Sequence, residues 1–310
     1  MRKQLKRGAA VSVQYENIEF LSEGATLRGR LHTSDNAQAP LVVLAHGFSA
    51  TAHMSVNAFA AGFAAAGYHA LAYDHRNFGT SEGEPRYSFD QWSQVRGYID
   101  AISHALTHND IDTQEVIVWG ESMGGANVQY VGAFDSRVAG VIAHTPGCGE
   151  KYVVPQSDNS DFLELDAFAK NGDLTEEPLK AIPVRFADLP TSEAPVILNF
   201  EGALNYAKAF GMRDGSLWSN DVTIVIRKAP ELSVPVVAPR LSMPTLYIVA
   251  PDDEVAGASP AVAKECFETI PGSKEWIDIE GGHFGLLHED SPLFQKALTA
   301  DLQFLETHFQ

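Results

Sequence analysis

Short apolar runs alternate with longer, alanine-rich segments along most of the chain. Four runs read as buried strands, namely "APLVVLAHG", "HALAYDH", "EVIVWGES" and "VAGVIAHTP". The segments between them, "NAFAAGFAAAGY", residues 90–107 and residues 123–133, have the spacing of helices with one apolar face. Strands that alternate with helices in this way are typical of βαβ units. The pattern therefore predicts an α/β fold around a mostly parallel sheet.

The two ends of the chain extend this pattern. Residues 11–20 and 25–33 predict an antiparallel hairpin that precedes the parallel strands. Near the other end, residues 243–253 and 273–284 predict two further strands, and the stretch "SPAVAKECFETI" between them predicts a helix. Residues 291–307 predict a closing helix.

The alternation is interrupted between residue 147 and about residue 243. This interval is acidic at first and then rich in proline, and its aromatic residues include Phe162, Phe168, Phe186, Phe200, Phe210 and Trp218. A structureless loop of this length inside a compact domain is uncommon, and the aromatic residues provide apolar surface to bury. We therefore expect residues 1–146 and 244–310 to form one core, and residues 147–243 to form an inserted cap over the active site.

Composition narrows the range of partners. The 310 residues include 40 acidic and 22 basic side chains, which gives a formal charge of −18. Such a charge repels nucleic acid phosphates and anionic membrane surfaces, so we expect neither as a partner. No run of 18 apolar residues and no export signal is visible in the sequence, and the only two cysteines, Cys148 and Cys266, predict free thiols in the cytoplasm.

The strongest chemical signal is "GESMGG", where Ser122 lies between Gly120 and Gly124. A Gly-x-Ser-x-Gly match alone is weak, and Ser122 could be an ordinary turn residue. Here, however, an apolar strand precedes the motif and a predicted helix follows it. A nucleophile elbow requires this succession of strand, sharp turn and helix, so the context favours Ser122 as a nucleophile.

A serine hydroxyl needs a base to take its proton and a carboxylate to orient that base. Asp252 and Asp253 directly follow one predicted strand, and His283 follows the next one. Because neighbouring parallel strands end at the same edge of a sheet, we expect these side chains to lie beside Ser122. The positions of the strands leave both aspartates as candidates.

An oxyanion formed on the substrate also needs two N–H donors, which the residue after the nucleophile and the loop after the third strand supply in such sites. The candidates are the amides of Met123 and Phe48, and Gly47 gives the Phe48 loop the freedom to turn. His46, in the same loop, is expected to orient it and not to act as the base.

Together, "HGFS", "DHRNFGTSEG", "GESMGG", "VAPDDEV" and "GGHFG" resemble the α/β-hydrolase family over most of residues 40–290. "DHRNFGTSEGEPR" and "GGHFGLLH" are most similar to the branch of hydrolases and acyltransferases of microbial secondary metabolism, including polyketide pathways. The resemblance implies the α/β-hydrolase fold with a chain order of serine, acid and histidine. It also favours Asp253 over Asp252, because Asp253 begins an Asp-x-Val turn similar to the acid loop of the family.

One stretch departs from the family pattern. Many members have Asp-x-Arg-Gly-x-Gly-x-Ser after the fourth strand, whereas Asn77 takes the place of the first glycine here. Asparagine tolerates a positive φ, so the turn can form. Asp74, Arg76 and Ser81 are interpreted as a structural polar cluster and not as catalytic groups.

Other signals are set aside. His104 and His108 lie four residues apart on a predicted helix, but no further ligand completes a metal site, so a solvated helix face is the simpler reading. The acidic run at residues 252–254 does not by itself indicate a cation site. The sequence around Cys148 does not form a nucleophile elbow, so Cys148 is expected to be an inert thiol. Glu121 and His144 are expected to be structural neighbours of the site. We expect no metal and no cofactor.

The sequence thus predicts a serine hydrolase that cleaves an ester, lactone or thioester through an acyl-enzyme on Ser122, with His283 as base and Asp253 as its partner. The expected substrate is a small acyl compound or an acyl-carrier thioester. Aromatic and aliphatic residues of the cap are expected to form an apolar pocket for the acyl group. Three alternatives stay open: an acyltransferase or C–C hydrolase with the same triad, a perhydrolase, and a non-catalytic ligand-binding protein on the hydrolase fold. The oligomeric state also stays open, and a homodimer is compatible with the sequence.

Overall fold

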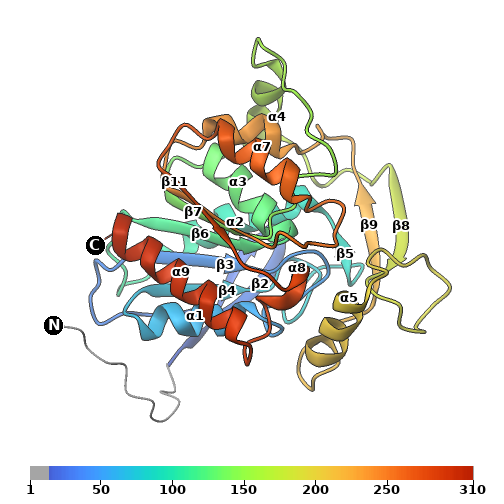
Figure 1. Ribbon diagram of the computed structural model, residues 1–310, viewed down its shortest axis with the longest axis horizontal. Coiled ribbons are helices and arrows are strands. Elements are labelled where there is room, and N and C mark those ends of the chain that lie inside the picture. Colours follow the sequence, from blue (N-terminus) through green and yellow to red (C-terminus); the bar gives the residue numbers. More distant parts are fainter. Residues whose placement is uncertain (1–13, 310) are drawn as a thin grey trace.

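The computed structural model describes residues 14–309, and a single large sheet forms its centre (Figure 1). In chain order its strands are β1 (Glu16–Ser22), β2 (Ala25–His32), β3 (Leu41–Ala45), β4 (His69–Tyr73), β6 (Val116–Glu121), β7 (Val138–His144), β10 (Thr245–Val249) and β11 (Lys274–Asp278). In space they follow the order β1-β2-β4-β3-β6-β7-β10-β11. The fold is the α/β-hydrolase fold that the sequence predicts.

The direction of the strands agrees with the predicted hairpin. β1 pairs antiparallel with β2, and β2 pairs antiparallel with β4. All other neighbours in this sheet are parallel. The predicted first strand begins at residue 11, and its residues 11–13 lie outside the described part of the chain. The parallel strands bring their carboxyl ends to one edge of the sheet, where active sites of open α/β sheets are found.

Helices cover both faces of the sheet (Figure 1). α1 (Val56–Ala65) and α9 (Pro292–His308) lie on one face, and α2 (Gln91–Ala105), α3 (Met123–Phe134) and α7 (Pro260–Thr269) lie on the other. In β3, Leu41 and Val43 join the apolar cluster on the α2 and α3 side, whereas Val42 and Leu44 join the cluster under α1 and α9. A strand buried on both faces reads as a continuous apolar run, which explains the pattern in the sequence.

The segment of residues 147–243, hereafter the inserted segment, contains its own regular structure. Its elements are α4 (Ser160–Asn171), β8 (Lys180–Arg185), α5 (Glu201–Tyr206), the π-helix η1 (Ala207–Gly211), β9 (Asp221–Ile226), α6 (Val234–Val237) and the 3₁₀ helix η2 (Ala238–Arg240). β8 and β9 form a second sheet together with β5 (Ser88–Phe89), which comes from outside this segment. A strand of two residues is too short to produce a pattern, so the sequence did not predict β5.

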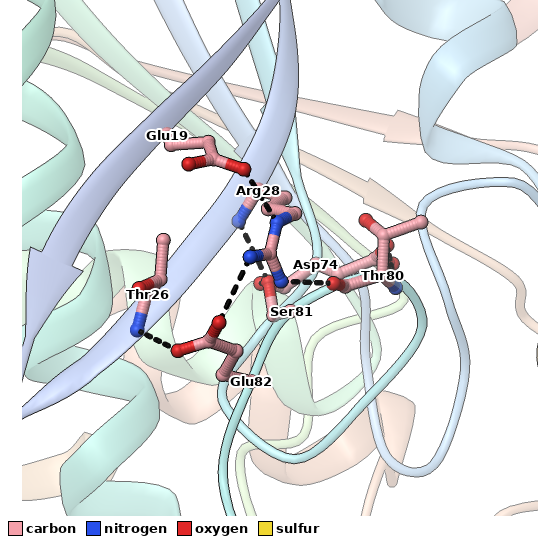
Figure 2. Close-up of polar contacts among 7 residues, drawn as sticks. All are labelled: Glu19, Thr26, Arg28, Asp74, Thr80, Ser81 and Glu82. Atoms are coloured by element: carbon pink, nitrogen blue, oxygen red, sulfur yellow. Dashed lines mark hydrogen bonds and ion pairs between the residues drawn. The ribbon is translucent and has the colours of Figure 1, made fainter.

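The turn after β4 carries the polar cluster around Asp74 (Figure 2). Its carboxylate accepts hydrogen bonds from the amide of Ala52 at 2.8 Å, the amide of Thr80 at 2.8 Å and the Thr80 hydroxyl at 2.9 Å. The Ser81 hydroxyl donates to the Asp74 carbonyl and accepts from the amide of Arg28. These contacts connect the turn after β4 with the loop after β3, as expected for a structural cluster.

Arg28 on β2 holds the exposed edge of the same turn. Its guanidinium contacts Glu19 at 2.7 Å, Glu82 at 2.9 Å and the carbonyl oxygen of Thr80 at 3.0 Å (Figure 2). Within this turn Asn77 has φ 74°, a left-handed conformation that asparagine adopts more readily than most residues. The turn therefore keeps its shape without the glycine that many family members have there.

Replacing Asp74 tests this cluster. Asp74→Ala leaves the buried amide of Ala52 and the donors of Thr80 without their acceptor, and we expect a loss of about 2–4 kcal/mol in the free energy of unfolding. Urea denaturation measures the change, with Glu82→Gln at the exposed edge as the matched control. A variant as stable as the wild type would show that the cluster is dispensable.

Candidate active site

Ser122 occupies the sharp turn between β6 and α3. Its backbone has φ 56° and ψ −120°, a conformation that residues other than glycine seldom adopt. The turn is held because the Ser122 amide donates to the His144 carbonyl at 2.9 Å and the Ser122 carbonyl accepts from the Gly147 amide at 2.9 Å. These bonds fix the nucleophile candidate to the ends of two adjacent strands.

The two glycines of the motif are required by close backbone contacts. A Cβ atom on Gly120 would lie 2.3 Å from the Gly124 carbonyl oxygen, and one on Gly124 would lie 3.1 Å from the Ala45 carbonyl oxygen. The first contact excludes any side chain at Gly120, and the second leaves little room for one at Gly124. This is the physical reason for the Gly-x-Ser-x-Gly spacing in this chain.

The structure brings Ser122, His283 and Asp253 together. His283 Nε2 lies 2.8 Å from Ser122 Oγ, and His283 Nδ1 lies 2.7 Å from Asp253 Oδ2. Asp253 follows β10, and His283 belongs to the short helix α8 (Gly282–Gly285) that follows β11. When Nδ1 donates its proton to the carboxylate, Nε2 carries a lone pair and can accept the proton of the Ser122 hydroxyl.

The neighbouring aspartates have different partners. Asp253 Oδ1 accepts from the Val255 amide at 2.8 Å, so the Asp-x-Val turn orients the carboxylate whose other oxygen contacts His283. Asp252 instead accepts from the Gly281 amide at 3.2 Å. Of these two residues, only Asp253 contacts the imidazole ring.

The predicted oxyanion donors lie on either side of Ser122. Met123 is the first residue of α3, where amides have no partner inside the helix. Within residues 14–309 neither the Met123 amide nor the Phe48 amide has a hydrogen-bond partner. A Cβ atom on Gly47 would lie 3.0 Å from Ser122 Cβ, so the backbone before Phe48 lies directly against the serine.

The Glu121 side chain holds the loop after β3, which carries Gly47 and Phe48. Its carboxylate accepts from the Gly47 amide at 2.8 Å, across 74 residues of sequence. Burial raises the pKa of Glu121, and the Gly47 amide and the nearby His283 and His144 partly oppose this shift. The sequence identified Glu121 only as a neighbour of the site, because no local pattern reveals a contact between residues so far apart.

Two further histidines support the site without contacting the serine hydroxyl. His46 Nε2 accepts from the His75 amide at 3.2 Å, so its Nδ1 donates to the Gly47 carbonyl at 2.9 Å. Burial lowers the pKa of His46, which favours this neutral form. His144 lies below the turn, with Nε2 2.7 Å from Asp301 Oδ1 on α9. Both therefore orient backbone around the site.

A cavity of about 920 Å³ opens beside Ser122 and His283. The inserted segment contributes aliphatic side chains to its wall, namely Leu165, Ile197, Leu198, Ile224, Val234 and Val236. The sequence predicted an apolar pocket with aromatic residues of this segment as well, and that part was wrong. These aromatic side chains pack on the protein core instead; Phe168, for example, lies 4.7 Å from the ring of Trp92.

The same cavity has an acidic lining on the side of the inserted segment. Its charged residues are four acids and one base, namely Glu150, Asp161, Glu164, Glu231 and Lys151. The charge around the cavity therefore has the same sign as that of the whole chain, and it disfavours anionic molecules.

The other candidate groups do not contact Ser122, His283 or Asp253. No group of three or more potential metal ligands occurs within the described residues. His108 contacts Glu16 at 2.6 Å. Cys148 and Cys266 are buried and free, and Cys148 lines the cavity. In the part of the chain that the structure describes, no helix is long and apolar enough to cross a membrane.

The raised pKa of Glu121 gives a stability test. A carboxyl group whose pKa is higher in the folded than in the unfolded protein stabilises most below its unfolded pKa, and this contribution is lost as the pH rises through the folded pKa. Glu121→Gln cannot ionise, so its stability relative to wild type should increase as the pH rises above the ordinary pKa of glutamate and through the raised pKa of Glu121. Urea denaturation at several pH values measures this, and a difference independent of pH would contradict it.

Comparison with known proteins places the chain in a family. The family model for the alpha/beta hydrolase fold matches residues 40–290. The quorum-quenching protein AidA of Acinetobacter baumannii (strain MDR-ZJ06) is 30% identical over 275 residues, which cover 86% of each chain.

Two fungal relatives are named for acyl chemistry. The thiohydrolase aneE of Aspergillus aculeatus is 37% identical over 133 residues, which are 43% of this chain and 42% of that protein. The acyltransferase drtE of Aspergillus calidoustus is 24% identical over 315 residues, which cover 94% of each chain. The predicted resemblance to the hydrolase and acyltransferase branch is confirmed, and a general hydrolase or acyltransferase role is supported. The chain belongs to the α/β-hydrolase family and is an enzyme of this type.

Proposed function

We propose that the protein is a serine hydrolase that cleaves a carboxylic ester, lactone or thioester through an acyl-enzyme on Ser122. The observation that carries the proposal is the continuous chain of contacts from Ser122 through His283 to Asp253 at the wall of an apolar cavity. Serine, base and orienting carboxylate have the geometry that nucleophilic catalysis needs.

The steps follow from the positions of the atoms. Ser122 Oγ attacks the acyl carbonyl carbon while its proton moves to His283 Nε2. The oxyanion accepts hydrogen bonds from the amides of Met123 and Phe48, and the carboxylate of Asp253 stabilises the imidazolium. His283 then gives the proton to the leaving group, which departs and leaves the acyl group on Ser122. Water attacks this acyl-enzyme by the same route and releases the acid.

In this proposal the inserted segment is the cap. Its aliphatic side chains face the cavity opposite the nucleophile, so the acyl group would lie between the cap and the sheet edge. A cavity of about 920 Å³ is at the large end of the range for small-molecule sites, which suits an extended acyl group.

Two other functions are compatible with the same fold. An alcohol or amine in place of water would make the enzyme an acyltransferase, in line with the name of its relative drtE. Product analysis with and without an added acceptor distinguishes hydrolysis from transfer. A ligand-binding protein on the same fold is the alternative of another class, and failure of a fluorophosphonate to label Ser122 in folded protein would favour it.

The first test is the loss of activity in site variants. With p-nitrophenyl esters of increasing chain length, Ser122→Ala and His283→Ala should each lower kcat by at least about 10³-fold, because nucleophile and base act as one unit. Labelling by a fluorophosphonate should disappear in Ser122→Ala and become much slower in His283→Ala, with thermal stability as the folding control. Activity that survives in Ser122→Ala would overturn the proposal.

The two aspartates provide an internal comparison. Asp253→Asn should lower kcat by about 10³–10⁴-fold, because the amide cannot hold His283 in the required tautomer. Asp252→Asn should change kcat by less than about threefold, because this exposed carboxylate bonds only to backbone. The reverse result would transfer the acid role to Asp252.

The acidic lining favours an uncharged acyl substrate over one attached to a phosphate-bearing carrier. We expect an N-acetylcysteamine thioester to exceed the coenzyme A thioester of the same acyl group by about tenfold in kcat/KM at low ionic strength. Added salt should reduce this ratio, because it screens the charges.

A double variant that removes two charges from the cavity lining tests whether charge, or the size of coenzyme A, sets this preference. Glu164→Gln with Glu231→Gln should improve the coenzyme A thioester selectively and leave the neutral thioester unchanged. A ratio that is unaffected by salt and by the variant would show that steric exclusion, and not charge, sets the preference. A coenzyme A thioester that is hydrolysed best would contradict the proposed substrate class.

A further inference from the structure

Three consecutive carboxylates hold two residues of the histidine loop, Gly281 and His283. Asp252 accepts from the Gly281 amide at 3.2 Å, Asp253 contacts the His283 ring at 2.7 Å, and Glu254 Oε2 accepts from the His283 amide at 2.9 Å. The sequence treated this acidic run only as the source of one catalytic acid. In the structure each member has a different task.

The loop before His283 has no regular structure of its own to maintain its shape. Gly281 has φ 120° and Gly282 has φ 67°, both in the left-handed region. α8 has only four residues, and His283 lies in its first turn, where backbone amides lack partners inside the helix. The Glu254 carboxylate supplies the missing acceptor for the amide of His283.

The contact depends on close packing. A Cβ atom on Gly282 would lie 2.5 Å from Glu254 Oε2, so a side chain at residue 282 would displace the carboxylate from its present position. On its other side Glu254 faces α5 of the inserted segment, where a Cβ atom on Gly202 would lie 3.4 Å from Glu254 Oε1. Glu254 does not line the cavity beside Ser122, so it does not contact a substrate there.

The geometry points to Glu254 as a positioning residue for His283. Asp253 holds the His283 ring at Nδ1, and Glu254 holds the backbone amide of His283. Two adjacent residues of one loop therefore fix both the ring and the backbone of the histidine. With both anchors in place, Nε2 stays 2.8 Å from Ser122 Oγ. This inference rests on the proposed function, since positioning matters only if His283 is the base.

Glu254→Ala removes the acceptor and tests this role. We expect kcat to fall by about 10–100-fold with KM nearly unchanged, because small displacements of a catalytic group have effects of this size. The rate of fluorophosphonate labelling of Ser122 should fall by the same factor. Glu254→Gln keeps an oxygen that can accept the His283 amide, so it should recover most of the activity.

Asp252→Ala is the matched control, since it also removes a carboxylate that accepts a loop amide, here the amide of Gly281 and not that of His283. Wild-type kcat in Glu254→Ala would overturn the inference, as would a loss confined to KM. An equal loss in Glu254→Gln and Glu254→Ala would also overturn it, because charge and not the hydrogen bond would then be responsible.

A readout without turnover separates this inference from the proposed function. The proton shared by His283 Nδ1 and Asp253 should give a low-field line in the proton NMR spectrum that Ser122→Ala keeps and Glu254→Ala broadens or shifts. If wild type neither hydrolyses esters nor reacts with the fluorophosphonate, the proposed function fails. An unchanged NMR line in Glu254→Ala would then refute the positioning role separately.

Discussion

The backbone conformation of Ser122 is the constraint on which the rest of the site depends. A residue with a side chain at φ 56° and ψ −120° costs about 1–3 kcal/mol, and it persists only where the surroundings enforce it. Here β6 and α3 meet so closely that Gly120 can carry no side chain, and Gly124 packs tightly against the backbone of the loop after β3. The same closeness puts Ser122 beside the loop after β3 and the end of β7. The strain is thus a consequence of packing strand, helix and loop around one hydroxyl.

Carboxylates outnumber cations around this hydroxyl, and each has a defined donor. Glu121 accepts the amide of Gly47, Asp253 contacts the ring of His283, and Asp301 contacts His144 beneath the turn. Buried acids are tolerated because their oxygens are hydrogen-bonded. A site organised by backbone donors and carboxylate acceptors holds its loops rigidly without needing cationic side chains. This arrangement suits a reaction in which the developing negative charge on the substrate is held by amides.

The sequence predicted those features that are encoded locally. The strands of the main sheet follow from short apolar runs, and Ser122, Asp253 and His283 lie directly after such runs, so their meeting at one sheet edge follows from strand direction. The roles of Glu121 and Glu254 were not predicted, because each carboxylate accepts from a backbone amide, and that contact depends on a side-chain direction that no sequence pattern shows. β5 was not predicted because its two residues are strand only through pairing with β9.

The aromatic residues of the inserted segment were expected to line the cavity, and their positions in the structure show a different role for this segment. Phe284 follows the catalytic histidine candidate, and its ring lies 4.7 Å from that of Tyr206 and 6.0 Å from that of Phe186, both from the inserted segment. Aromatic residues therefore support the loop that carries His283, while aliphatic residues of the same segment face the cavity. Large flat side chains bury most surface where they interlock with a core, and branched aliphatic ones leave space beside the nucleophile. A change in the inserted segment can for this reason alter the position of the base as well as the shape of the cavity.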